Sequence, residues 1–138
     1  RMEFHTRDAL ISAVDELLKL DDTGAEPHPT YGPVGSWDVS NVTDMSYMFW
    51  KAHNFNQPLD GWDVSNVEDM ESMFCHANKF NQPLDKWDVS NVVNMESMFY
   101  YATNFNQPLD RWNVWNVTDM QHMFYDSAME SNTPPWYH

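Results

Sequence analysis

Residues 37–61 read WDVSNVTDMSYMFWKAHNFNQPLDG, and two further copies of this motif follow directly. They are WDVSNVEDMESMFCHANKFNQPLDK at 62–86 and WDVSNVVNMESMFYYATNFNQPLDR at 87–111. A fourth copy begins at Trp112 and loses the pattern after Phe124. A fixed period of this kind, between about 20 and 50 residues, is typical of solenoids, in which each unit buries its apolar face against its neighbours.

Each repeat contains three local signals. The aromatic and β-branched residues of Trp-Asp-Val-Ser at 37–40 predict a short strand. The next apolar residues follow at the helical spacing i, i+3, i+4 and i+7, and they are Met45, Met48, Phe49 and Ala52. This spacing predicts a helix of about two turns with these side chains facing the core. The run before each next tryptophan contains Pro58, Pro83 or Pro108 and predicts an extended return, because the residue before a proline avoids helical backbone.

Stacked copies of this unit predict an α/β solenoid similar to leucine-rich repeats, with short parallel strands on one side and short helices on the other. The repeats would occupy 37–128, divided into 37–61, 62–86, 87–111 and 112–128. Residues 1–36 would form a capping helix, starting near Thr6, and a connector. The expected inner face of that helix is Leu10, Val14, Leu17 and Leu18. Residues 129–138 would form either a cap or the start of a continuing chain.

Composition excludes several classes of protein. The 138 residues carry a formal net charge of −14, so we expect no nucleic-acid partner, because such domains show a basic face. No apolar run is long enough for a membrane span, so we expect none, and the given residues do not begin with the charged and apolar pattern expected of a signal peptide. Cys75 is the single cysteine, which excludes an internal disulfide.

The units WDVSNVTDMSYMF and FNQPLDGWDVSNV closely resemble the repeat of the BspA-like leucine-rich-repeat surface proteins. The same unit occurs in mycoplasma-type surface lipoproteins and in listerial surface proteins with a repeat near 25 residues. The resemblance covers residues 37–124. It implies an extracellular or cell-surface protein used in adhesion and protein–protein interaction, and it brings no catalytic residues that could be transferred to this chain.

The sequence predicts no enzyme, no cofactor and no metal site. His53, His76 and His122 fall in different columns of the repeat, so stacking does not align them as ligands. Stacked strands would bring the aspartates that follow each tryptophan to about 4.8 Å from one another. Two carboxylates at such distances can serve a glycosidase, so a carbohydrate-active enzyme is the minor alternative. A repeated ladder, however, gives every aspartate a similar environment, whereas acid and base roles need different pKa values.

Two surfaces are candidate binding sites. Successive side chains of a strand point to opposite faces, so on the predicted strands we expect these side chains to point outward: Asp38, Ser40, Asp63, Ser65, Asp88 and Ser90. If these carboxylates face solvent, they would attract a Ca²⁺ ion or a basic partner; alternatively, they cap turns. On the outer helix face we expect a docking stripe for a protein partner or a neighbouring domain, formed by Tyr47, Trp50, Tyr100 and Tyr125. The alternative is that these rings fill gaps between adjacent helices.

Overall fold

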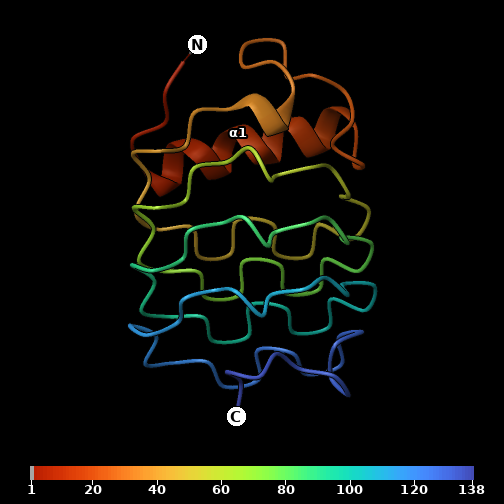
Figure 1. Cartoon of the computed structure of the whole chain (residues 1–138). Coiled ribbons are helices and arrows are strands. Elements are labelled where there is room, and N and C mark those ends of the chain that lie inside the picture. Colours follow the sequence, from red (N-terminus) through yellow and green to blue (C-terminus); the bar gives the residue numbers. More distant parts are fainter. Residues whose placement is uncertain (1) are drawn as a thin grey trace.

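The computed structural model describes residues 2–138. Its α-helix, α1 (Arg7–Leu20), lies across one end of a stack of coils, and the chain ends at the opposite end of the stack (Figure 1). Each coil is one sequence repeat: coil 1 is 37–61, coil 2 is 62–86, coil 3 is 87–111, and coil 4 begins at 112. A short 3₁₀ turn, η1 (Val34–Ser36), precedes coil 1. Within residues 2–138, no helix is long and apolar enough to cross a membrane.

The predicted N-terminal helix is confirmed. The Thr6 hydroxyl oxygen accepts the Ala9 N–H at 3.1 Å, which satisfies one of the free donors of the first turn. Asp8 in the first turn and Lys19 in the last turn both complement the helix dipole. The buried face consists of Leu10, Ala13, Val14 and Leu17, and Leu18 is only partly buried. This face packs into the same core as the coils.

The predicted α/β solenoid is wrong, because the repeats contain neither helices nor a sheet. The segments expected to be helical are successive turns. Their backbone enters the left-handed region at every fourth residue, with φ of 60° at Tyr47 and 58° at Lys51, and the later coils repeat this at Ser72, His76, Ser97, Tyr101, His122 and Asp126. A non-glycine residue rarely takes this conformation, and an α-helix cannot contain it.

Hydrogen bonding between coils explains why turns replace the helix. Alternate amides donate to the next coil: the Met45 N–H to the Asp69 carbonyl at 2.9 Å and the Phe49 N–H to the Met73 carbonyl at 2.8 Å. The amides between them donate within the same coil and form turns: the Met48 N–H donates to the Met45 carbonyl at 3.3 Å. A helix would have used these groups internally and left the coils without backbone bonds to one another.

The predicted strands are also absent. The Asp38 carboxylate accepts the Ser40 N–H at 3.2 Å and the Ser40 hydroxyl at 2.7 Å, and this bends the Trp-Asp-Val-Ser segment into a turn. The parallel contacts between coils are isolated bridges at another position of the repeat, and they run through Asp44, Asp69, Asn94 and Asp119. Within residues 2–138 the backbone forms bridges of this kind but no extended ladder.

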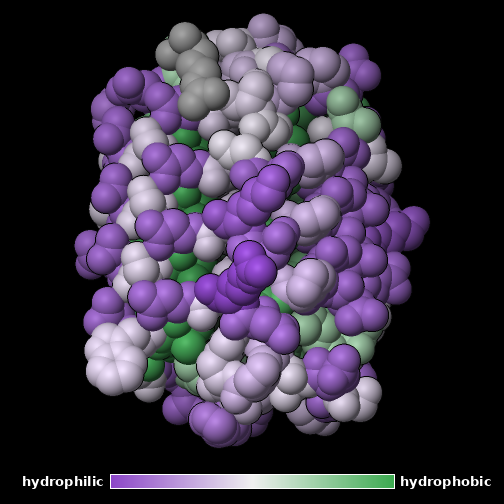
Figure 2. All heavy atoms as spheres, in the orientation of Figure 1, coloured by the Kyte–Doolittle hydropathy of each residue, from purple (hydrophilic) through white to green (hydrophobic). Residues whose placement is uncertain are grey.

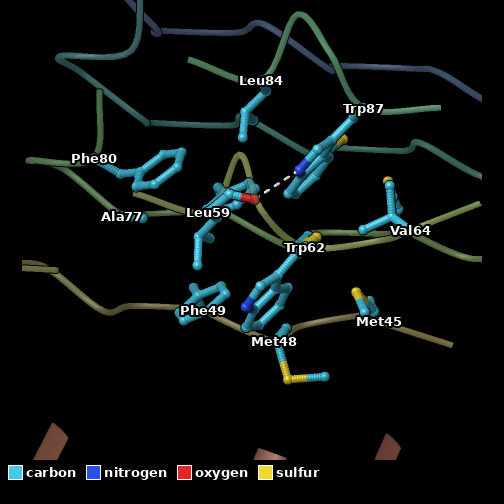
Figure 3. Close-up of a cluster of buried hydrophobic side chains, with 14 of the residues drawn as sticks. Met45, Met48, Phe49, Leu59, Trp62, Val64, Ala77, Phe80, Leu84 and Trp87 are labelled. Carbon is cyan, nitrogen blue, oxygen red and sulfur yellow. Dashed lines mark hydrogen bonds between the residues drawn. The ribbon is translucent and has the colours of Figure 1, made fainter. Parts of the chain in front are cut away.

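The core consists of columns of identical side chains. Phenylalanine rings stack along the coil axis with centroids 5.5 Å apart between Phe49 and Phe74 and 5.6 Å apart between Phe74 and Phe99. The tryptophan that opens each repeat lies in the core, and its indole N–H donates to a backbone carbonyl that precedes it in the chain; for Trp87 and Trp112 this carbonyl belongs to the coil before. The Trp87 indole bonds the Leu59 carbonyl at 2.9 Å (Figure 3). The indole polar group is therefore satisfied inside an apolar core.

The tryptophan column extends into the C-terminal tail. Trp136 lies 24 residues after Trp112, so the 25-residue spacing does not point to it. Its ring nevertheless stacks on Trp112 at 6.3 Å, and its indole N–H donates to the Leu109 carbonyl at 2.9 Å. This is the bond that Trp112 makes with Leu84. The tail therefore closes part of the last coil.

Candidate functional site

Aromatic side chains gather on the outer side of the turns. Trp50 is 48% exposed, Tyr125 is 47% exposed and Tyr47 is 38% exposed, whereas Tyr100 is half-buried. Cys75 shares the column of Trp50 and is buried. The predicted stripe is therefore exposed at its two ends and interrupted in coil 2. We call these rings, together with the aromatic side chains that contact them, the aromatic surface; it consists of Tyr47, Trp50, His76, Tyr100, Tyr101, His122 and Tyr125.

One end of the aromatic surface is a tyrosine–tryptophan pair. The rings of Tyr47 and Trp50 meet edge to face with centroids 6.1 Å apart. The Lys51 ammonium lies 4.5 Å from the centre of the Trp50 ring, a distance at which a cation attracts the ring face. The Tyr47 hydroxyl donates to the Glu71 carboxylate at 2.9 Å, and this bond raises the pKa of Tyr47. These contacts orient both rings without burying them.

The other end is a cluster of stacked rings from coils 2 to 4. Tyr100 and Tyr125 stack at 5.3 Å with an angle of 18° between their planes. His76 and Tyr101 stack at 4.8 Å and are nearly parallel. Sequence reasoning missed His76 and Tyr101, because a helix would have turned position 76 away from position 75. The usable signal was that both residues occupy one column of the repeat, so stacking brings their rings together.

Cys75 lies between these two groups and does not extend them. Burial raises the pKa of its thiol, although the nearby Lys51 charge acts in the opposite direction. A buried thiol with a raised pKa is a poor nucleophile at neutral pH, because the thiolate is the reactive form. The residue is a packing element of coil 2.

The aspartates of the predicted aspartate–serine column accept hydrogen bonds from serines of their own coil. Asp63 and Asp88 each accept the N–H of the serine two residues later at 3.0 Å and the hydroxyl of that serine at 2.6 Å, as Asp38 does with Ser40. The serines are Ser65 and Ser90. These bonds confirm the alternative prediction, in which the aspartates cap turns. Among residues 2–138, no group of three or more histidine, cysteine or acidic side chains is placed to hold a metal ion.

These bonds predict a pH dependence of stability. The hydroxyl and N–H of Ser90 lower the pKa of Asp88 below its usual value of 3.8. A carboxylate with a lowered pKa stabilises the folded state above the unfolded pKa, and this contribution is lost as the pH falls through the folded pKa. Below about pH 4, Asp88→Asn should therefore lose less stability than the unmodified chain, as measured by urea unfolding from pH 2 to pH 7.

The fourth repeat provides the control for this substitution. Asn113 stands at the aspartate position, and its side-chain oxygen accepts the Trp115 N–H at 3.0 Å. The amide therefore makes the same turn, and Asp88→Asn should change stability at pH 7 by less than about 1 kcal/mol. Asp88→Ala removes the acceptor and should be less stable at pH 7. An equal pH profile for Asp88→Asn and the unmodified chain would contradict the assignment.

An open groove of about 670 Å³ runs along the coils on another side. The asparagine column lines it, and in coils 2 to 4 each side-chain amide donates to the coil before it, as Asn66 does to the Ser40 carbonyl at 2.8 Å and Asn91 does to the Ser65 carbonyl at 2.7 Å. Figure 2 shows one face of the molecule, which is mostly hydrophilic, with hydrophobic atoms visible between rows of polar side chains. These hydrogen bonds join one coil to the next, so the asparagines that line the groove have a structural role.

The chain matches a protein-family model over most of its length. A family model described as "Mycoplasma protein of unknown function, DUF285" matches residues 24–136. This range covers the connector, every coil and the tail through Trp136. No curated protein and no solved structure matches the chain.

Proposed function

The chain belongs to the family described as "Mycoplasma protein of unknown function, DUF285", and we propose that it is a non-catalytic module that binds a protein partner or a neighbouring domain. The aromatic surface carries this proposal. Tryptophan and tyrosine are the residues most enriched at binding hot spots. Trp50 and Tyr125 leave about half of their surface in water, whereas Cys75 in the same column is buried.

The motif supports a proposal for the location. The repeat resembles that of the BspA-like surface proteins, so we propose that this chain lies outside the cell or on its surface. Adhesion through the aromatic surface is consistent with that location. The acidic charge, −14 over the chain, would keep such a module soluble at high local density.

A carbohydrate-active enzyme is less well supported. Its acid and base would have to come from the aspartate column, yet Asp63 and Asp88 make the same pair of bonds to their own serines. Glycosidases instead place two carboxylates in unlike environments that push their pKa values apart. We therefore favour binding over catalysis.

The proposed function is tested by substitution at the exposed rings. We expect Trp50→Ser with Tyr125→Ser to weaken binding to a captured partner at least tenfold, because hot-spot residues each contribute roughly 2 kcal/mol or more. The melting temperature should change little, since both rings are about half exposed. Partners would be sought on an array of purified extracellular proteins and glycans, and affinities measured by surface plasmon resonance.

The matched control is Trp115→Ser. Trp115 is 90% exposed but lies outside the aromatic surface, so its removal should leave this affinity unchanged. Loss of binding in Trp115→Ser, together with normal binding in the double variant, would contradict the proposal. A large fall in melting temperature of the double variant would instead assign these rings to the core.

A further inference from the structure

The groove of about 670 Å³ presents a similar polar surface in every coil. Two columns of exposed side chains line it. The first column is Asn41, Asn66, Asn91 and Asn116, and the second is Thr43, Glu68, Val93 and Thr118. The residues between the two columns in the sequence are valines, of which Val42, Val67 and Val92 are fully buried. The groove therefore follows the direction in which the coils stack (Figure 1).

The asparagine side chains that line the groove keep hydrogen-bonding groups for a ligand. In coils 2 to 4 the Nδ2 atom donates to the coil before it at 2.7–2.8 Å, which fixes the plane of the amide. Within residues 2–138, no hydrogen bond uses the Oδ1 atoms of Asn66, Asn91 and Asn116. A side-chain amide also has a second N–H. Each of these coils therefore offers one acceptor and one donor, which suits a ligand that donates and accepts at every coil.

Backbone carbonyls beside the groove are already used between the coils. The Thr43 carbonyl accepts the Glu68 N–H at 2.7 Å, and the Glu68 carbonyl accepts the Val93 N–H at 2.8 Å. The serine carbonyls before the asparagines accept the side-chain amides of the next coil. A peptide strand that joins a sheet binds through free backbone groups along an edge. These carbonyls are not free, so they do not favour a peptide strand.

The spacing of the coils distinguishes between extended polymers. Coils joined by backbone bonds of 2.7–2.9 Å lie about 4.8 Å apart, as adjacent strands do. A peptide strand places the side chains of one face about 6.6 Å apart, so they fall out of register with successive coils. An extended chain of β-1,4-linked hexoses advances by close to one coil spacing for each sugar. Successive sugars can therefore meet successive coils.

The groove itself carries little charge. Of its eight lining residues, Glu68 is the one with a charged side chain. The net charge of −14 over the chain disfavours a polyanion, whereas a polycation would find a single carboxylate in the groove. Val93, which is 43% exposed, offers an apolar contact that suits the C–H groups of a sugar ring. A neutral polymer with many hydroxyl groups fits this surface.

We propose that the groove binds a neutral, extended polysaccharide of β-1,4-linked hexoses, with one sugar for each coil. The sugar hydroxyls would donate to the Oδ1 atoms of the asparagines and accept their second N–H groups, because a hydroxyl can do both. Four coils line the groove, so it would hold four sugars. The site shares no residue with the aromatic surface and goes beyond the proposed function.

The test is a titration of the isotope-labelled chain with cello-oligosaccharides of two to six sugars, followed by the asparagine side-chain resonances. We expect those of Asn66 and Asn91 to shift, whereas those of Asn81 and Asn106, in another column of the repeat, should not. The Kd should fall at least fivefold for each added sugar from two to four, and threefold at most from four to six. Maltohexaose contains the same sugar but coils through α-1,4 linkages, and it should bind at least tenfold more weakly than cellohexaose.

Substitutions at Val93 test the position of the site. Val93→Arg places a long charged side chain in the middle of the groove, and it should raise the Kd for cellohexaose at least tenfold. The matched control is Val93→Thr, which copies Thr43 and Thr118 and should keep the Kd within twofold. Both variants should melt close to the unmodified chain, because Val93 is exposed. Trp50→Ser should leave the Kd unchanged.

Several results would overturn the proposal. The absence of shifts at millimolar cellohexaose would show that the groove does not bind this polymer. Equal affinity for maltohexaose, or an affinity independent of chain length, would remove the spacing argument. Unchanged binding by Val93→Arg would place the site elsewhere. Shifts with a capped octapeptide of alternating serine and valine, and none with the sugars, would assign the groove to a protein segment. None of these results bears on the function proposed for the aromatic surface.

Discussion

Replacing Phe74 with alanine is expected to lower the free energy of unfolding by about 3–5 kcal/mol, the usual range for truncating a buried aromatic ring. Phe74 is fully buried and lies at the centre of the phenylalanine column. Its ring stacks on Phe80 at 4.2 Å, on Phe49 at 5.5 Å and on Phe99 at 5.6 Å. The cavity would therefore remove contacts with coils 1 and 3 as well as with its own coil.

Urea unfolding followed by tryptophan fluorescence measures this loss. Because the coils share one core, we expect a single transition that moves as a whole. Tyr125→Ala is the matched control: it also removes an aromatic ring, but one that is 47% exposed, and it should cost far less. A loss below about 0.5 kcal/mol for Phe74→Ala would be typical of a surface position and would contradict the described core.

Ser97→Val is expected to cost about 1–3 kcal/mol, because it places a β-branched residue in left-handed backbone. Ser97 has φ of 55°, and its N–H and carbonyl are both bonded, to Gln121 and Tyr100. The backbone therefore cannot relax without losing a bond to coil 4. In a helix the same substitution would be nearly neutral, since serine and valine have similar helix propensities.

Two further variants isolate the backbone effect. Ser97→Gly should be close to neutral, because glycine takes positive φ without strain. Glu96→Val places the same side chain one residue earlier, where φ is not positive, and should cost less than Ser97→Val. Thermal and urea unfolding of the three variants measure the order of stability. Equal stability of Ser97→Val and Ser97→Gly would support the helix that the sequence predicts and contradict the turns.

The candidate sites could be predicted only where residues of one chemical type recur at one position of the repeat. The exposed rings of Trp50 and Tyr125 could be predicted from their column, and the turn-capping role of Asp63 and Asp88 was a stated alternative. The hydrogen bonds between coils could not be predicted. They form because alternate amides point toward the next coil, and that follows from a backbone conformation that the sequence analysis did not predict.

The sequence by itself determined which side chains are buried. Met45, Met48 and Phe49 lie in the core as their spacing predicts, and so do their counterparts in coils 2 and 3. The reason is that the repeat fixes the composition of each column, and apolar columns can only be buried against their neighbours. The N-terminal helix was predictable as well, because its cap and its apolar face are local features.

Only the tertiary structure decided the path of the backbone between these side chains. The spacing i, i+3, i+4 and i+7 fits an α-helix, but it also fits a chain of turns that buries the same residues. The two differ in where the amides donate: a helix keeps them inside the segment, whereas the turns give every second amide to the next coil. Such bonds join residues 24 positions apart, as Phe49 and Met73 are, so no local pattern can reveal them. In the stacked coils, backbone groups form hydrogen bonds both within a coil and with the next coil. These bonds stabilise the left-handed turns at Tyr47 and Lys51.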